Sequence, residues 1–135
     1  MKIRVISSRE EIDSIRPNEK MIHLAFRASN VDFLKMMQKA PRLQVVQLPP
    51  SYLKTMSKAI DVFLEMQGVK LLEGDVWGHR RDLDEYFTIP DEALRAIKIM
   101  NEKGVAPEEM AKEVQKTVKL GTDLVKYIAG TGIAA

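Results

Sequence analysis

The sequence predicts an α/β fold: a small four-stranded, mainly parallel sheet built from strand–helix repeats, followed by a helical C-terminal region. Short apolar runs rich in β-branched residues alternate with stretches of helical periodicity, so that strand and helix repeat three times before a fourth strand. Strands joined by helices run parallel, with right-handed crossovers. The 135 residues suit one compact unit, with a sheet domain over 1–90 and a helical region over 91–135 packed on it.

Local signals mark the helices between these strands. An S-x-x-E motif at Ser8 predicts a capping box for the first helix, and Ser29 and Asn30 offer caps for the second. Pro50 opens a longer third helix, which should continue to a C-cap glycine at Gly68. The predicted strands occupy residues 3–7, 21–26, 43–48 and 69–72.

The second, third and fourth strands form a loose internal repeat. Each follows a helix and then a Pro or Gly, and their spacing falls within the range of leucine-rich repeats. The sheet is therefore either leucine-rich-repeat-like or Rossmann-like. So few units favour a small sheet over a solenoid.

The sequence of the C-terminal region predicts three helices, which begin at Asp91, at Pro107 and after Gly121. Their order is typical of a helix-turn-helix, but the connection is long and the last helix carries Lys126 as its sole base. Residues 91–135 hold equal numbers of basic and acidic side chains, whereas DNA binding needs a positive face. We therefore expect a module that covers the sheet or contacts another subunit, and a DNA-binding regulator is the alternative.

Composition excludes several classes of site. The chain has no cysteine, which rules out disulfides, thiolate metal sites and a cysteine nucleophile. Its two histidines lie far apart, so we predict no metal and no cofactor. A net charge of +2, from 21 basic and 19 acidic residues, does not by itself predict nucleic-acid binding. No apolar run suits a membrane span and no signal peptide is recognisable, so we expect a cytoplasmic protein.

The richest chemistry lies in residues 73–86, directly after the fourth predicted strand. Open α/β sheets bind ligands outside the carboxyl ends of their strands, and arginines beside helix N-termini favour anions. No glycine-rich phosphate loop is present, and the same residues would also serve as solvated turn and capping residues. We predict a site for a small anionic ligand at this edge, formed by Arg9, Arg27, Ser29, Asn30, Tyr52, Asp75, Trp77, His79 and Arg80.

His79 supports a third hypothesis, a hydrolase-like enzyme in which Asp75, Asp82 or Asp84 is the orienting carboxylate. No nucleophile lies nearby in the sequence, so a structural histidine is the favoured interpretation. The acidic residues that follow lack the spacing of a calcium loop and, beside two arginines, indicate an ion-pair network. Trp77 should pin its loop to the sheet, and His23, on a predicted buried strand, should be a satisfied core residue.

Three segments, 18–27, 47–52 and 63–82, resemble a family of small uncharacterised proteins from methanogenic archaea. The last is the most specific and reads F-L-E-M-Q-G-V-K-L-L-E-G-D-V-W-G-H-R-R-D. The resemblance covers most of the chain and implies an archaeal, cytoplasmic setting. It assigns no activity and carries over no functional residue.

The residues themselves predict a non-catalytic binding or regulatory protein that recognises a small anion or a protein partner at the carboxyl edge of the sheet. The exposed edge of so small a sheet also suits homodimerisation.

Overall fold

A computed structural model describes residues 1–76 and 85–131 of the chain. They form an α/β protein with a mixed, mostly parallel sheet of five strands in the order β4-β3-β2-β1-β5. The prediction of a four-stranded parallel sheet is confirmed for β1 to β4, and a fifth strand, antiparallel to β1, was missed. The strands are β1 Lys2–Ile6, β2 Met21–Leu24, β3 Val45–Leu48, β4 Lys70–Glu73 and β5 Tyr86–Thr88.

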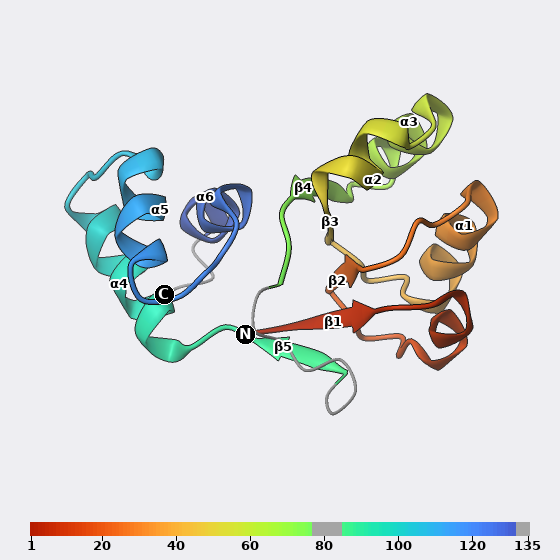
Figure 1. The fold of residues 1–135 in the computed structure, drawn as a ribbon, viewed down its shortest axis with the longest axis horizontal. Coiled ribbons are helices and arrows are strands. Elements are labelled where there is room, and N and C mark those ends of the chain that lie inside the picture. Colours follow the sequence, from red (N-terminus) through yellow and green to blue (C-terminus); the bar gives the residue numbers. More distant parts are fainter. Residues whose placement is uncertain (77–84, 132–135) are drawn as a thin grey trace.

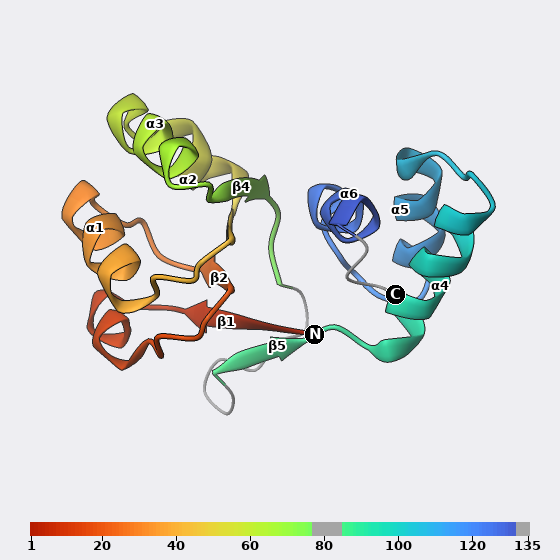
Figure 2. The same ribbon diagram turned by 180° about the vertical axis from the view of Figure 1, so that it is seen from behind.

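Two groups of helices cover the sheet, one group on each face (Figures 1 and 2). The connections between the parallel strands supply the 3-10 helix η1 Arg9–Ser14 and the α-helices α1 Asn30–Lys39, α2 Pro50–Thr55 and α3 Lys58–Met66. The C-terminal region supplies α4 Asp91–Glu102, α5 Pro107–Gln115 and α6 Thr122–Thr131.

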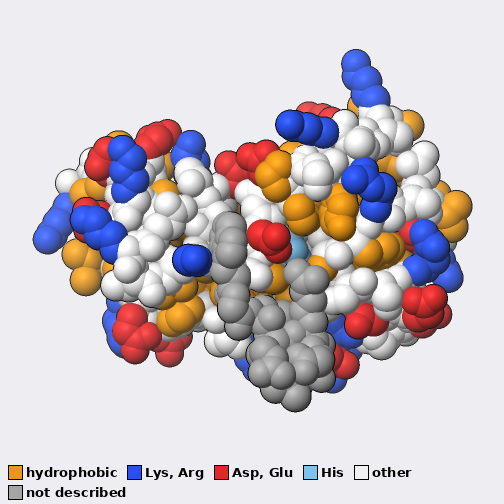
Figure 3. Space-filling view, in the orientation of Figure 1, with side chains coloured by type: hydrophobic (Ala, Val, Ile, Leu, Met, Phe, Trp, Pro, Cys, Tyr) orange, Lys and Arg blue, Asp and Glu red, His pale blue; other side chains and the backbone are white. Residues whose placement is uncertain are grey.

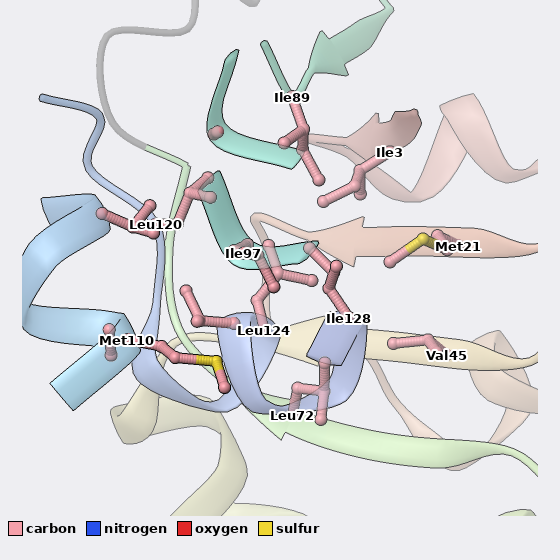
Figure 4. Packing of buried hydrophobic residues seen from close by; sticks show 14 residues of the cluster. Ile3, Met21, Val45, Leu72, Ile89, Ile97, Met110, Leu120, Leu124 and Ile128 are labelled. Atoms are coloured by element: carbon pink, nitrogen blue, oxygen red, sulfur yellow. The ribbon is translucent and has the colours of Figure 1, made fainter. Parts of the chain in front are cut away.

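Alternation along the strands gives the sheet two apolar faces and the protein two cores. One face packs against η1, α1 and α3 through Ile6, Ile22, Leu24, Val46 and Leu48. The other face carries Ile3, Met21, Val45 and Leu72, which pack against the C-terminal helices (Figure 4). The C-terminal helices therefore complete the second core of the sheet.

The strand order has a consequence for ligand binding. β1 to β4 lie in sequence order, and their connecting helices all pack on the same face. This winding is common to leucine-rich repeats and to half of a Rossmann fold. A crevice at the carboxyl edge forms where the strand order reverses, and among the described parallel strands there is no such reversal.

Several predicted helix boundaries need correction. The single helix expected from Pro50 to Gly68 is two helices, because Ser57 begins α3 anew and its hydroxyl accepts the Ile60 N–H at 3.2 Å. The capping box expected at Ser8 was wrong, since its side chain makes no capping bond. The helix cap expected at Ser29 is confirmed, and with Asp32 it forms a capping box that was not predicted.

None of the described helices is both long and apolar enough to cross a membrane.

The turn that leads into β4 depends on the backbone conformation of Gly68. Its φ of +75° lies in the left-handed region, and an added Cβ would meet nothing within 4 Å. Gly68→Ala should therefore lower the free energy of unfolding by about 1 kcal/mol through backbone strain alone. Gly130→Ala, where a Cβ also meets open space but α6 is helical, should be neutral or stabilising by up to about 1 kcal/mol. Equal effects in denaturant unfolding would contradict this explanation.

Candidate functional site

The structure divides the predicted anion-site residues among separate places. Trp77, His79, Arg80 and Asp82 lie outside the described residues. Five others lie on the face covered by α1 to α3: Arg9, Arg27, Ser29, Asn30 and Tyr52. Their described side-chain partners are one another, residues of these helices, or Ser57, which caps α3. Asp75 instead contacts His23.

The Arg9 side chain is bound to the first turn of α1. Its Nε donates to both carboxylate oxygens of Asp32, at 2.9 and 3.0 Å. Asp32 also accepts the Ser29 N–H at 2.8 Å, while the Ser29 hydroxyl accepts the Asp32 N–H at 3.2 Å. Burial acts to raise the pKa of Asp32, but the hydrogen bonds from Arg9 and Ser29 outweigh it and lower the pKa. This arginine therefore serves the helix cap.

Arg27 is likewise engaged within the protein. Its guanidinium carbon lies 4.9 Å from the centroid of the Tyr52 ring, and Nη1 contacts the Thr55 hydroxyl. The cavity beside them encloses about 30 Å³, which suits a water molecule better than a phosphate. Asn30 accepts a hydrogen bond from the Ser57 hydroxyl at 3.0 Å. The carboxyl-edge anion site stays a prediction, and the described contacts weaken it.

A polar cluster of the buried His23 and Gln47 with the partly exposed Asp75 lies on the sheet face shared with the C-terminal helices. His23 and Gln47 are cross-strand partners on β2 and β3, and both are buried. Gln47 Nε2 lies 3.0 Å from His23 Nδ1, and His23 Nε2 lies 3.3 Å from Asp75 Oδ1. Gln47 Nε2 also donates to the Asp75 carbonyl oxygen at 3.3 Å, so the three residues form one connected polar network.

The C-terminal region approaches this cluster through its backbone. A Cβ on Gly121 would lie 3.3 Å from the Glu73 carbonyl oxygen and 3.7 Å from Gln47 Oε1. A Cβ on Gly74 would lie 3.0 Å from the same amide oxygen. Asp123, in the first turn of α6, accepts the Glu73 N–H at 3.0 Å. The start of α6 is thereby tied to the end of β4.

The expectation that His23 is a buried residue with polar partners is confirmed, whereas Gln47 was not singled out. A signal was present: His23 and Gln47 occupy the same position of two repeat units, M-I-H-L and V-V-Q-L. Two polar residues at one position of adjacent parallel strands indicate a cross-strand pair. Within residues 1–76 and 85–131, no group of acidic or histidine side chains suits a metal ion.

The α4, α5 and α6 helices pack as a three-helix unit, with α6 also against β4. Leu124, Val125 and Ile128 are buried, so α6 presents a narrow exposed stripe that includes Thr122 and Lys126. Lys126 forms an ion pair with Glu108 at 3.1 Å; the backbone at the start of α5, followed by Lys126, lowers the pKa of Glu108. Figure 3 shows basic and acidic side chains interspersed on the face of these helices that it displays.

The fold defines the class of this protein as an α/β unit followed by three packed helices. Residues 2–85 match a family of unknown function (DUF1699), N-terminal domain. Residues 92–130 match a protein of unknown function (DUF1699), C-terminal HTH domain. The chain belongs to the DUF1699 family. No curated protein and no solved structure matches it.

The Arg9–Asp32 pair predicts a dependence of stability on pH. The pKa of Asp32 is lowered in the folded protein, so its contribution is present above the unfolded pKa of about 3.9 and is lost as the pH falls through the folded value. Asp32→Asn should cost about 1 kcal/mol near neutral pH, with a difference from wild type that disappears in acid. Asp61→Asn, an exposed residue in the first turn of α3, is the matched control. A pH-independent difference in urea unfolding would refute the assignment.

The His23–Gln47 contact can be measured by a double-mutant cycle. Gln47→Leu should lower the free energy of unfolding by about 1–3 kcal/mol, because a buried His23 nitrogen loses its partner. The double variant His23→Leu with Gln47→Leu should cost less than the sum of the single changes, by about 1 kcal/mol. Additive effects would show that the two side chains do not interact.

Proposed function

We propose that this protein is a DNA-binding regulator whose C-terminal helix-turn-helix contacts the DNA backbone. The observation that carries the proposal is the match of residues 92–130 to an HTH domain, on a segment that folds as α4, α5, a turn and α6. In helix-turn-helix proteins, the second helix of the motif reaches the DNA. Here that helix is α6.

The surface for this role comprises the turn before α6 and the exposed stripe of α6. It offers three exposed lysines, Lys116, Lys119 and Lys126, together with the Thr122 hydroxyl. Lys116 pairs with Glu113 at 2.9 Å and Lys126 with Glu108 at 3.1 Å, whereas Lys119 has no ion pair within the described part of the chain. Because these are exposed pairs of low net stability, DNA phosphates can replace the carboxylates.

The docking of α6 on β4 limits how deeply this surface can enter a groove. The apolar side of α6 is buried against the sheet and the other helices (Figure 4), and Asp123 holds the Glu73 N–H. Phosphate contacts should therefore dominate over base contacts, which gives weak, salt-sensitive binding. The same docking connects the α/β region to α6 and suits that region to a regulatory role. The setting that we infer, from the sequence resemblance alone, is the archaeal cytoplasm.

DNA binding should be measurable by fluorescence anisotropy with a pool of random duplexes. About three phosphate contacts predict a slope of roughly −3 or shallower for log affinity against log salt concentration. Replacement of Lys116, Lys119 and Lys126 by Gln should reduce the affinity at low salt and flatten the slope. Flat titrations of the wild type at low salt would eliminate the proposal.

A matched control separates a defined surface from general charge. Lys39, Lys54 and Lys58 are exposed lysines at or near the ends of the α1 to α3 helices, and their replacement by Gln changes the net charge by the same amount. This control triple should retain most of the affinity. An equal loss in both triples would show that binding is non-specific and would reject the assignment to the C-terminal domain.

A further inference from the structure

A hollow with a basic rim lies at the amino edge of the sheet, on the opposite edge from the predicted anion site. It has a volume of about 350 Å³. The residues that line this basic hollow are Lys2, Arg16, Asn18, Glu19, Lys20 and Tyr86.

A tight turn and two strands bring the basic side chains together. The Glu19 N–H donates to the Arg16 carbonyl at 3.2 Å, which closes a turn over Pro17 and Asn18. The turn brings both Arg16 and Lys20 to the lining of the hollow. Lys2 comes from β1, beside Thr88 of the β5 strand. The fold thus brings together three basic side chains, Lys2, Arg16 and Lys20, from two separate segments of the chain.

The Tyr86 ring forms the centre of this arrangement. Lys2 Nζ, Arg4 Cζ and Arg16 Cζ lie 5.9, 5.7 and 5.9 Å from its centroid. Its hydroxyl donates to the buried Glu19 carboxylate, and burial, followed by Glu19, raises the pKa of Tyr86. The phenol therefore remains protonated and gives the Glu19 carboxylate a hydrogen-bond donor, while Glu19 keeps its negative charge.

The charges around the hollow are left partly unmatched. Arg4, which is 2% exposed, pairs with Glu85 at 3.2 Å and donates to Ser14 at 2.7 Å, but its Nε has no partner in the described part of the chain. Lys2, Arg16 and Lys20 are exposed and form no ion pair with a described residue. Four basic groups against two carboxylates leave two net positive charges.

We propose that the basic hollow is a binding site for a phosphate group. Two excess positive charges match a phosphate dianion, and the ammonium and guanidinium donors that line the same hollow can contact several of its oxygens. The carboxyl-edge arginines lack this freedom, because Asp32 and Tyr52 engage them. The phosphate belongs either to a small metabolite or to a nucleic-acid backbone. The proposal does not depend on DNA binding by the C-terminal helices.

The test is calorimetric titration of the whole protein with inorganic phosphate, against chloride at matched ionic strength. The wild type should bind phosphate, and the double variant Arg16→Gln with Lys20→Gln should bind at least tenfold more weakly. Lys39→Gln, an exposed lysine on α1, should bind as the wild type does. Unchanged thermal unfolding without phosphate will show that the double variant is folded. Failure of the wild type to respond, or equal affinity in the double variant, would overturn the site.

Competition then distinguishes the two sources of phosphate. Displacement of phosphate by mononucleotides, with no displacement by duplex DNA, supports the site and assigns it to a small ligand. Displacement by duplex DNA in a protein that carries Gln at Lys116, Lys119 and Lys126 supports the site and assigns it to a nucleic-acid backbone. Because that protein lacks the helix-turn-helix surface, failure of one proposal leaves the other testable.

Discussion

The consecutive winding of β1 to β4 is the constraint on which the rest of this structure depends. Three connections in the same direction place η1, α1 and α3 on a single face of the sheet. The opposite face is just as apolar, because alternate strand residues such as Met21 and Val45 point away from those helices. A sheet with one uncovered apolar face is unstable in water, so a second layer is required. The C-terminal helices supply that layer.

This requirement explains why α6 has two roles. In an independent helix-turn-helix domain, the helix at its position packs on two neighbours and leaves a broad outer face. Here the same helix also buries Leu124 and Ile128 toward the sheet, and Asp123 completes the edge strand β4 by accepting an outward-facing N–H. The end of β4 and the start of α6 are therefore held together by a direct contact. Gly121 lies at this contact, where a larger residue would press on the Glu73 carbonyl.

Local patterns were sufficient to predict most elements, because each signal depends only on residues close to it in the sequence. Apolar strand runs, the proline that starts a helix (Pro50) and the glycine that precedes a strand (Gly68) are signals of this kind. The missed features depend on distant partners. β5 has three residues and lies beside β1 only because the chain returns antiparallel to it. Arg9 was assigned to a ligand because its pairing with Asp32 spans two elements. The charged segment 73–86 lies largely outside the described residues, so the roles of Trp77 and His79 remain sequence predictions.

The two edges of the sheet differ in electrostatics for a reason inherent in the fold. At the carboxyl edge the helices begin, and their free N–H groups favour caps and acidic residues such as Ser29 and Asp32. Those carboxylates then recruit the arginines of the same edge, as Asp32 does with Arg9. At the amino edge the helices end, which favours basic side chains and provides no capping carboxylate to neutralise them. Arg16 and Lys20 are exposed there and form no ion pair with a described residue, so unmatched positive charge lies at the edge where an α/β sheet is not usually searched for a ligand.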